Sequence, residues 1–212
     1  IGLFFFGWAV LCEKFAVGNV CYALIGAAIP LMISGGFHVD GYMDTMDAFH
    51  SYQSREKKLE ILKDSHIGAF AAIMLALYYM IDIAAISEIH TQKAVSALAA
   101  VFFLARCFSG IAVMTLQPAK KEGLLYTFAS SAQKVRVKAA LYFQAVLCVV
   151  LMLLVSGWYG AAAIGAVLLS FFYFKKKSYK ELGGITGDTA GFFVTVCEAA
   201  AAAAVAVTGY FL

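Results

Sequence analysis

Charged side chains are scarce in this chain. Asp, Glu, Lys and Arg make up only 14% of its 212 residues, whereas 63% of the residues are hydrophobic. Soluble domains contain about 25% charged residues, so this composition places the chain among membrane proteins. The two prolines and eighteen glycines do not give the composition of a disordered chain. The small net charge of +3 gives no indication of nucleic-acid binding, and none is expected.

The chain also lacks the cysteine pattern of a disulfide framework or a zinc site. Its five cysteines are odd in number, form no Cys-x-x-Cys pair and lie in apolar stretches. We therefore expect free, buried thiols that pack as small hydrophobes.

Long apolar segments predict an all-α, polytopic transmembrane bundle of about six to seven spans, because a span needs about 20 apolar residues. Residues 1–12 resemble the last part of a membrane span, and no basic region or cleavage site of a signal peptide accompanies them. We therefore expect a further N-terminal segment in the natural protein. Residues 1–212 are interpreted as a single integral-membrane catalytic domain. The predicted apolar segments are 1–12, 16–36, 67–86, 94–116, 139–157, 160–174 and 189–212.

Positive charges are concentrated in three polar segments, 37–66, 117–138 and 175–188. These contain thirteen of the sixteen Lys and Arg residues, whereas the opposite connections contain only Lys14 and Lys93. The span count places the three segments on one side of the membrane, and the positive-inside rule makes that side cytoplasmic. The sequence thus predicts a multi-pass protein of the cell (inner) membrane with a site assembled from cytoplasmic loops.

Three carboxylates, Asp40, Asp44 and Asp47, follow one another at i, i+4 and i+7 in the first polar segment. In a helix they would share one face, where like charges repel each other. A solvated amphipathic stretch is the alternative to a functional site. Because Mg²⁺ prefers carboxylate oxygens and often shares its ligands with substrate phosphates, we favour a magnesium-dependent site that handles phosphates.

Two further aspartates are candidates for the same metal site. Asp64 precedes the segment 67–86, so it is predicted either to cap that helix or to complete the metal shell. Asp188 closes the glycine-rich stretch 183–188, where Thr186 or Asp188 could cap the last span. A helix N-terminus with glycines also suits an anion, which makes Gly183, Gly184, Thr186 and Gly187 candidate substrate-binding residues.

Arg106 lies inside a predicted span, where a charge is costly unless it is paired or faces a cavity. It is expected either to pair with Asp82 or Glu198, or to bind a substrate phosphate through its guanidinium fork. His38 lies beside the aspartates and is a candidate general acid or base.

The motifs resemble those of the cobalamin synthase family, the adenosylcobinamide-GDP ribazoletransferases. The resemblance covers Gly-Gly-Phe-His-Val-Asp-Gly-Tyr-Met-Asp-Thr-Met-Asp at 35–47, the stretch 57–70, Leu-Ala-Arg at 104–106 and Gln-Pro-Ala-Lys-Lys-Glu-Gly-Leu at 117–124. It also covers Gly-Gly-Ile-Thr-Gly-Asp at 183–188, with Gly191 and Glu198.

This resemblance implies an Mg²⁺-dependent membrane enzyme that joins adenosylcobinamide-GDP to α-ribazole, or to α-ribazole 5′-phosphate, and releases GMP. In such a reaction Asp40, Asp44 and Asp47 would hold Mg²⁺ against the diphosphate, and Asp188 and Asp64 would complete the metal shell. Arg106, Lys120 and Lys121 would bind phosphate oxygens, and a carboxylate or His38 would accept the proton of the attacking hydroxyl.

Two other functions compete with this interpretation. A lipid phosphotransferase acting on CDP-alcohols would carry Asp-Gly-x-x-Ala-Arg, but Asp40-Gly41 is followed by Tyr42-Met43-Asp44. An ion-coupled transporter would place its charges near the bilayer midplane, whereas here most acids lie in or near the loops. The alanine-rich stretch 199–206 predicts close packing against another helix, in this chain or in a second copy that would make a homo-oligomer.

Overall fold

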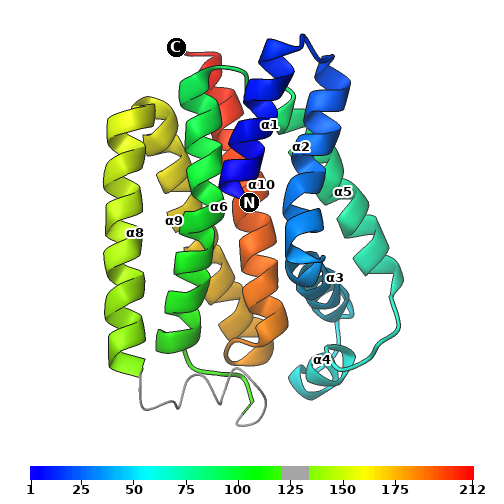
Figure 1. Ribbon diagram of the computed structural model, residues 1–212. Coiled ribbons are helices and arrows are strands. Elements are labelled where there is room, and N and C mark those ends of the chain that lie inside the picture. Colours follow the sequence, from blue (N-terminus) through cyan, green and yellow to red (C-terminus); the bar gives the residue numbers. More distant parts are fainter. Residues whose placement is uncertain (121–133) are drawn as a thin grey trace.

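The chain forms an all-helical bundle in the computed structural model, which describes residues 1–120 and 134–212 (Figure 1). The described ranges contain the helices α1 (Gly2–Lys14), α2 (Asn19–Ser34), α3 (Phe37–His50), α4 (Arg55–Ile61), α5 (Ala69–Ile86), α6 (Gln92–Thr115), α8 (Lys134–Ser156), α9 (Trp158–Leu182) and α10 (Gly187–Gly209).

Five of these helices, α5, α6, α8, α9 and α10, are long and apolar enough to cross a membrane. The pair α2 and α3 counts as a sixth span if it is taken as one segment bent by 95°. Helix α1 has 13 residues, which is too short to span the bilayer alone. The predicted polytopic bundle is confirmed, with five or six spans in the described residues against the six to seven expected.

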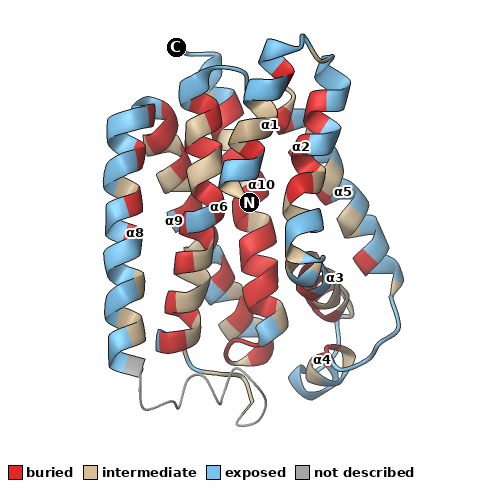
Figure 2. Cartoon of the chain, viewed as in Figure 1, coloured by how far each residue is buried: buried red, intermediate tan, exposed pale blue. Residues whose placement is uncertain are grey.

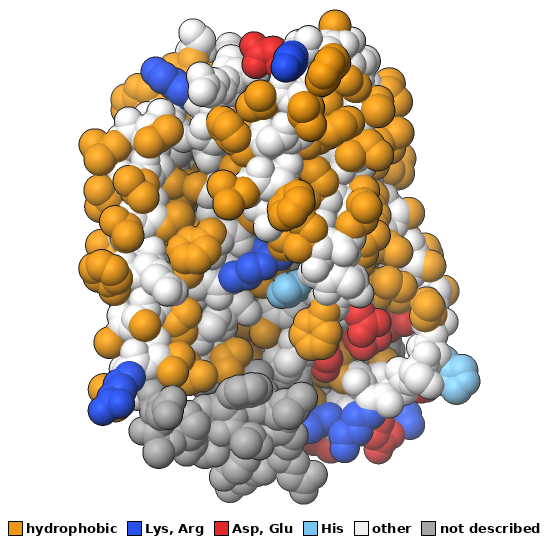
Figure 3. Space-filling model, viewed as in Figure 1, with side chains coloured by type: hydrophobic (Ala, Val, Ile, Leu, Met, Phe, Trp, Pro, Cys, Tyr) orange, Lys and Arg blue, Asp and Glu red, His pale blue; other side chains and the backbone are white. Residues whose placement is uncertain are grey.

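Helix α10 forms the centre of the bundle, where it packs against α3, α5, α6 and α9 (Figure 2). Ala201 and Ala202 of α10 are fully buried. Their small side chains let the neighbouring helices approach α10 closely. The predicted packing of the stretch 199–206 therefore occurs largely within this chain. Helix α8 lies at the edge and exposes large apolar side chains such as Phe143 and Leu154, as expected for a lipid-facing helix. Figure 3 shows the apolar outer surface, with most charged groups toward the two ends.

The described parts of the three basic segments lie at one end of the bundle, the lower end in Figure 1. The segment 37–66 is largely helical, because α3 and α4 occupy most of it. Helix α9 continues through Lys175–Lys180 to Leu182, so the predicted end of that span at residue 174 was wrong. Only the part of a helix that lies in lipid must be apolar, so the end of an apolar run need not be the end of the helix. Lysines are favourable in the last turn of a helix, where they face its negative end.

All five cysteines are free, and Cys12, Cys107, Cys148 and Cys197 are buried. The prediction of buried thiols is confirmed for these four and was wrong for Cys21, which is exposed.

Candidate active site at the α3–α10 crossing

The aspartate helix α3 is set across the end of the bundle by two glycines. Gly35 and Gly36 have φ values of +64° and +81°, in the left-handed region that glycine adopts without a steric penalty. They end α2 and turn the chain by 95° into α3. Asp40, Asp44 and Asp47 all lie within α3, so the stretch is helical and their spacing places them along one side of it.

Helix α3 crosses α10 at two glycines that allow close backbone contact. A Cβ atom on Gly41 would lie 2.8 Å from the backbone oxygen of Asp188, and one on Gly191 would lie 3.0 Å from the backbone oxygen of His38. The Thr195 hydroxyl donates a hydrogen bond of 3.1 Å to that same His38 oxygen. This crossing brings Asp188 next to the aspartate helix from a distant part of the sequence.

Asp44 lies at the centre of the resulting carboxylate cluster. It is half-buried and experiences the negative charges of Asp40, Asp188 and Asp47. Asp40 is exposed and Asp188 is half-buried, so the cluster opens to its surroundings on the Asp40 side. Mutual repulsion among these carboxylates would be relieved by a bound cation.

Asp47 makes contacts that differ from those of Asp40 and Asp44. Its two carboxylate oxygens accept hydrogen bonds from the backbone N–H groups of Gly68, at 2.6 Å, and Ala71, at 2.9 Å. These N–H groups belong to the first turn of α5, which has no helical partner for them. Asp47 therefore fastens the start of α5 to α3, a role that the sequence analysis had considered for Asp64.

Asp64 does not cap α5. It is exposed and accepts hydrogen bonds from the backbone N–H of His66, at 3.1 Å, and the Nδ1 of His66, at 2.6 Å. The hydrogen bond lowers the pKa of Asp64 and raises the pKa of His66. Asp64 is not among the carboxylates whose charges act on Asp44.

Arg106 pairs with Glu198, which is one of the two partners the sequence analysis considered. Its Nη1 donates to Glu198 Oε1 at 2.6 Å and to the Phe102 carbonyl at 2.5 Å. The Arg106 side chain remains 28% exposed and interacts electrostatically with His38. The Nδ1 of His38 is buried and has no hydrogen-bond partner among the described residues. The two side chains thus lie together at the start of α3.

The glycine-rich stretch 183–187 forms a tight connection between α9 and α10. Gly183 ends α9 with a φ of +71°, and a Cβ atom on Gly184 would lie 2.5 Å from the carbonyl oxygen of Gln117. Residues 117–119 pair with Ile185 through hydrogen bonds of 2.8 and 3.0 Å. Thr186 caps α10 in a capping box with Thr189, which settles that Thr186, rather than Asp188, is the N-cap. Gly187 is the first residue of α10 and is exposed.

Lys120 reaches two parts of the site. Its Nζ donates to the carbonyl oxygen of Leu59 in α4 at 2.9 Å, and its charge interacts with the Asp188 carboxylate. Lys121, the other basic residue proposed from the sequence, lies outside the described residues.

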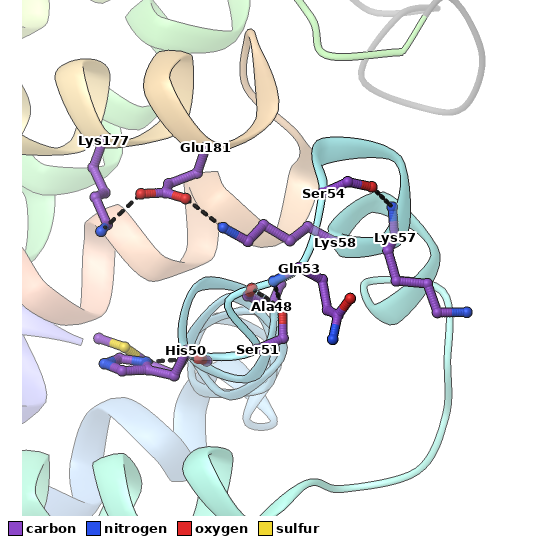
Figure 4. A network of polar contacts seen from close by, with 10 residues as sticks. Ala48, His50, Ser51, Gln53, Ser54, Lys57, Lys58, Lys177 and Glu181 are labelled. Carbon is purple, nitrogen blue, oxygen red and sulfur yellow. Dashed lines mark hydrogen bonds and ion pairs between the residues drawn. The ribbon is translucent and has the colours of Figure 1, made fainter.

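The sequence analysis missed the residues that hold α4 in place. Figure 4 shows Lys58 of α4 pointing to Glu181 of α9, which also faces Lys177. The Lys58–Glu181 ion pair is 2.5 Å long, and the two side chains are only 8% and 13% exposed. The Lys177–Glu181 pair measures 3.0 Å. In the sequence these residues are recognisable only as charged, and charged residues are equally typical of a solvated loop.

The site offers oxygen donors to a hard cation but no complete protein cage. Within residues 1–120 and 134–212, no three His, Cys, Asp or Glu side chains are arranged to hold a metal ion together. Mg²⁺ usually binds through one or two carboxylates together with waters and substrate phosphates. One or two of the carboxylates Asp40, Asp44 and Asp188 would suffice for that mode of binding. The metal roles expected for Asp47, whose two oxygens accept hydrogen bonds from α5, and for Asp64 stay predictions.

Comparisons with known proteins identify the family. The family described as "Cobalamin-5-phosphate synthase" matches residues 1–206. The chain is similar to proteins named adenosylcobinamide-GDP ribazoletransferase. Its identity to the one from Lachnoclostridium phytofermentans is 41% over 207 residues, covering 98% of this chain and 79% of the relative. Its identity to the one from Clostridium botulinum is 33% over 174 residues, covering 80% and 68%.

The relative from Escherichia coli is 29% identical over 178 residues, which cover 83% of this chain and 71% of the relative. No solved structure matches the chain. The family match spans α1 to most of α10 and includes every described side chain placed at the crossing above. The chain belongs to the cobalamin-5-phosphate synthase family.

Proposed function

We propose that this protein is an adenosylcobinamide-GDP ribazoletransferase of the membrane and catalyses the final assembly step of cobalamin. The family match over residues 1–206 supports this activity. The observation that carries the site assignment is the crossing of α3 and α10, which gathers Asp40, Asp44 and Asp188 beside Lys120. The family match also favours this function over a CDP-alcohol phosphotransferase or a transporter.

In this reaction the hydroxyl of α-ribazole, or of its 5′-phosphate, attacks the phosphorus linked to cobinamide. A new P–O bond forms to ribazole, and the bond from that phosphorus to the phosphate of GMP breaks. The hydroxyl proton leaves to a base, for which a carboxylate of the cluster and His38 are the candidates, and GMP departs. Phosphoryl transfer depends chiefly on charge neutralisation and alignment of the reacting groups.

One or two of the carboxylates Asp40, Asp44 and Asp188 would hold Mg²⁺ in this site together with substrate phosphate oxygens. The ion would neutralise charge on the diphosphate. Lys120 would add a positive charge beside Asp188, and Arg106 would interact with the substrate near the start of α3. Asp47 would keep the site in shape by holding the start of α5 against α3. Helix α3, helix α4 and the connection between α9 and α10 lie at one end of the bundle, which we assign to the cytoplasmic face of the cell membrane by the positive-inside rule.

The test is an assay of purified protein in liposomes with adenosylcobinamide-GDP, α-ribazole and Mg²⁺. We expect GMP and a joined corrinoid to form in equal amounts, with loss of both on addition of EDTA. Asp44→Asn should lower the rate at least about 100-fold, as expected when a group that stabilises transition-state charge is lost. Gly165→Ala on α9, which has open space around it, should retain activity.

Absence of both products from the wild type would refute the proposed reaction. Full activity in EDTA would refute the magnesium dependence, and full activity of Asp44→Asn would refute the role of that residue.

A further inference from the structure

Arg55 lies against the glycine turn that connects α9 and α10. A Cβ atom on Gly183 would collide with the Arg55 guanidinium, so the guanidinium occupies the space left by the missing side chain. Arg55 is the first residue of α4, more than 120 residues before Gly183 in the sequence. Glycine is therefore required here for two reasons: its φ of +71°, and the space that the Arg55 guanidinium occupies.

The backbone that carries Arg55 is fixed at three points. Lys58 pairs with the largely buried Glu181, Lys120 donates to the Leu59 carbonyl, and the Ser54 hydroxyl caps the helix by accepting from the N–H of Lys57 (Figure 4). A short helix is not stable by itself, so these contacts hold α4 on the end of α9. Arg55 is therefore placed by tertiary contacts, although its side chain is exposed.

The guanidinium has unused donors beside the candidate active site. Arg55 makes no hydrogen bond or ion pair with any residue that the structure describes, apart from an electrostatic interaction with neighbouring Glu56. Lys120 links the two regions, since it contacts α4 and also acts on Asp188.

We propose that Arg55 is a substrate-binding residue that holds the phosphate leaving with GMP. This inference rests on the proposed function. Arg55 packs on the turn that leads to Asp188, and Lys120 joins α4, the helix of Arg55, to Asp188. If the phosphorus linked to cobinamide reacts at the carboxylates, Arg55 would take the second phosphate of the diphosphate. A guanidinium offers a planar pair of N–H donors that matches two phosphate oxygens, which an ammonium group cannot reproduce.

The test compares Arg55→Gln, Arg55→Lys and the control Lys57→Gln in the liposome assay. Lys57 is an exposed neighbour on α4, so its replacement removes the same charge from the same helix. For Arg55→Gln we expect the KM for adenosylcobinamide-GDP and the inhibition constant of GMP each to rise about tenfold, equivalent to about 1.4 kcal/mol. The KM for α-ribazole should not change. Arg55→Lys should give an intermediate effect, and Lys57→Gln should match the wild type.

Direct binding of GMP, measured by equilibrium dialysis in the presence of Mg²⁺, separates this inference from the reaction itself. A wild type that binds GMP while Arg55→Gln binds it about tenfold more weakly supports the role of Arg55, even if no joined corrinoid forms. Equal binding by both proteins would overturn the inference and leave the proposed reaction intact. Equal losses in Arg55→Gln and Lys57→Gln would also overturn it, because they would indicate a general charge effect.

Discussion

The buried Lys58–Glu181 pair offers a quantitative test of how α4 is held on the bundle. Replacing Glu181 by Met removes the acceptor shared by Lys58 and Lys177, and leaves Lys58 with its side chain only 8% exposed and without a partner. Breaking a buried ion pair from one side costs about 3–5 kcal/mol. At about 2–4 °C per kcal/mol for a chain of this size, Glu181→Met should lower the melting temperature by roughly 6–20 °C.

The opposite replacement should cost less. In Lys58→Met the Glu181 carboxylate keeps Lys177 at 3.0 Å, so we expect a loss of about 1.5–3 kcal/mol, typical of one hydrogen bond to a charged group. The double variant Lys58→Met/Glu181→Met removes both buried charges and restores apolar packing. It should therefore be more stable than the sum of the two single losses predicts, because the two residues interact directly.

The buried cysteines provide the assay. A maleimide dye that fluoresces on reaction with thiols will report unfolding in detergent as Cys12, Cys107, Cys148 and Cys197 become exposed. Cys21 is already exposed, so Cys21→Ser serves as the background for every variant. Equal shifts for the two single variants, or strictly additive losses in the double variant, would refute the argument that Lys58 depends on Glu181 while Glu181 has a second partner.

Two further predictions concern the helix crossing and the loop before α5. Gly41→Ala places a Cβ atom 2.8 Å from the Asp188 backbone oxygen and should cost about 1–3 kcal/mol through overpacking, with loss of transferase activity. In the thiol melting assay Gly165→Ala should be neutral, and an unchanged Gly41→Ala would disprove the close crossing. By NMR, His66 should titrate above its ordinary pKa of 6.5, and Asp64→Asn should move the midpoint back toward 6.5. Since the pKa of folded His66 is raised, its contact with Asp64 is stabilising at low pH and is lost as the pH rises through that midpoint, so a midpoint unaffected by Asp64→Asn would contradict the pairing.

Much of the site could be read from the spacing of residues near one another in the chain. The i, i+4, i+7 spacing of Asp40, Asp44 and Asp47 places them on one face of any helix that contains them, and this follows from the sequence alone because it is a local periodicity. It could not show that Asp47 uses both carboxylate oxygens on the N–H groups of Gly68 and Ala71. That role depends on where α5 begins in space, and the same information assigned Asp64 to a local contact with His66.

The sequence by itself determined the class of the protein, since apolar runs of about 20 residues in lipid must form helices, and the placement of lysine and arginine predicted which ends of those helices meet. The tertiary structure decided which distant residues come together. Glycines at positions 41 and 191 let α10 bring Asp188 to α3, and the Lys58–Glu181 pair brings Arg55 to Gly183. Such contacts arise from close packing between helices far apart in the chain, and no local pattern in the sequence specifies them.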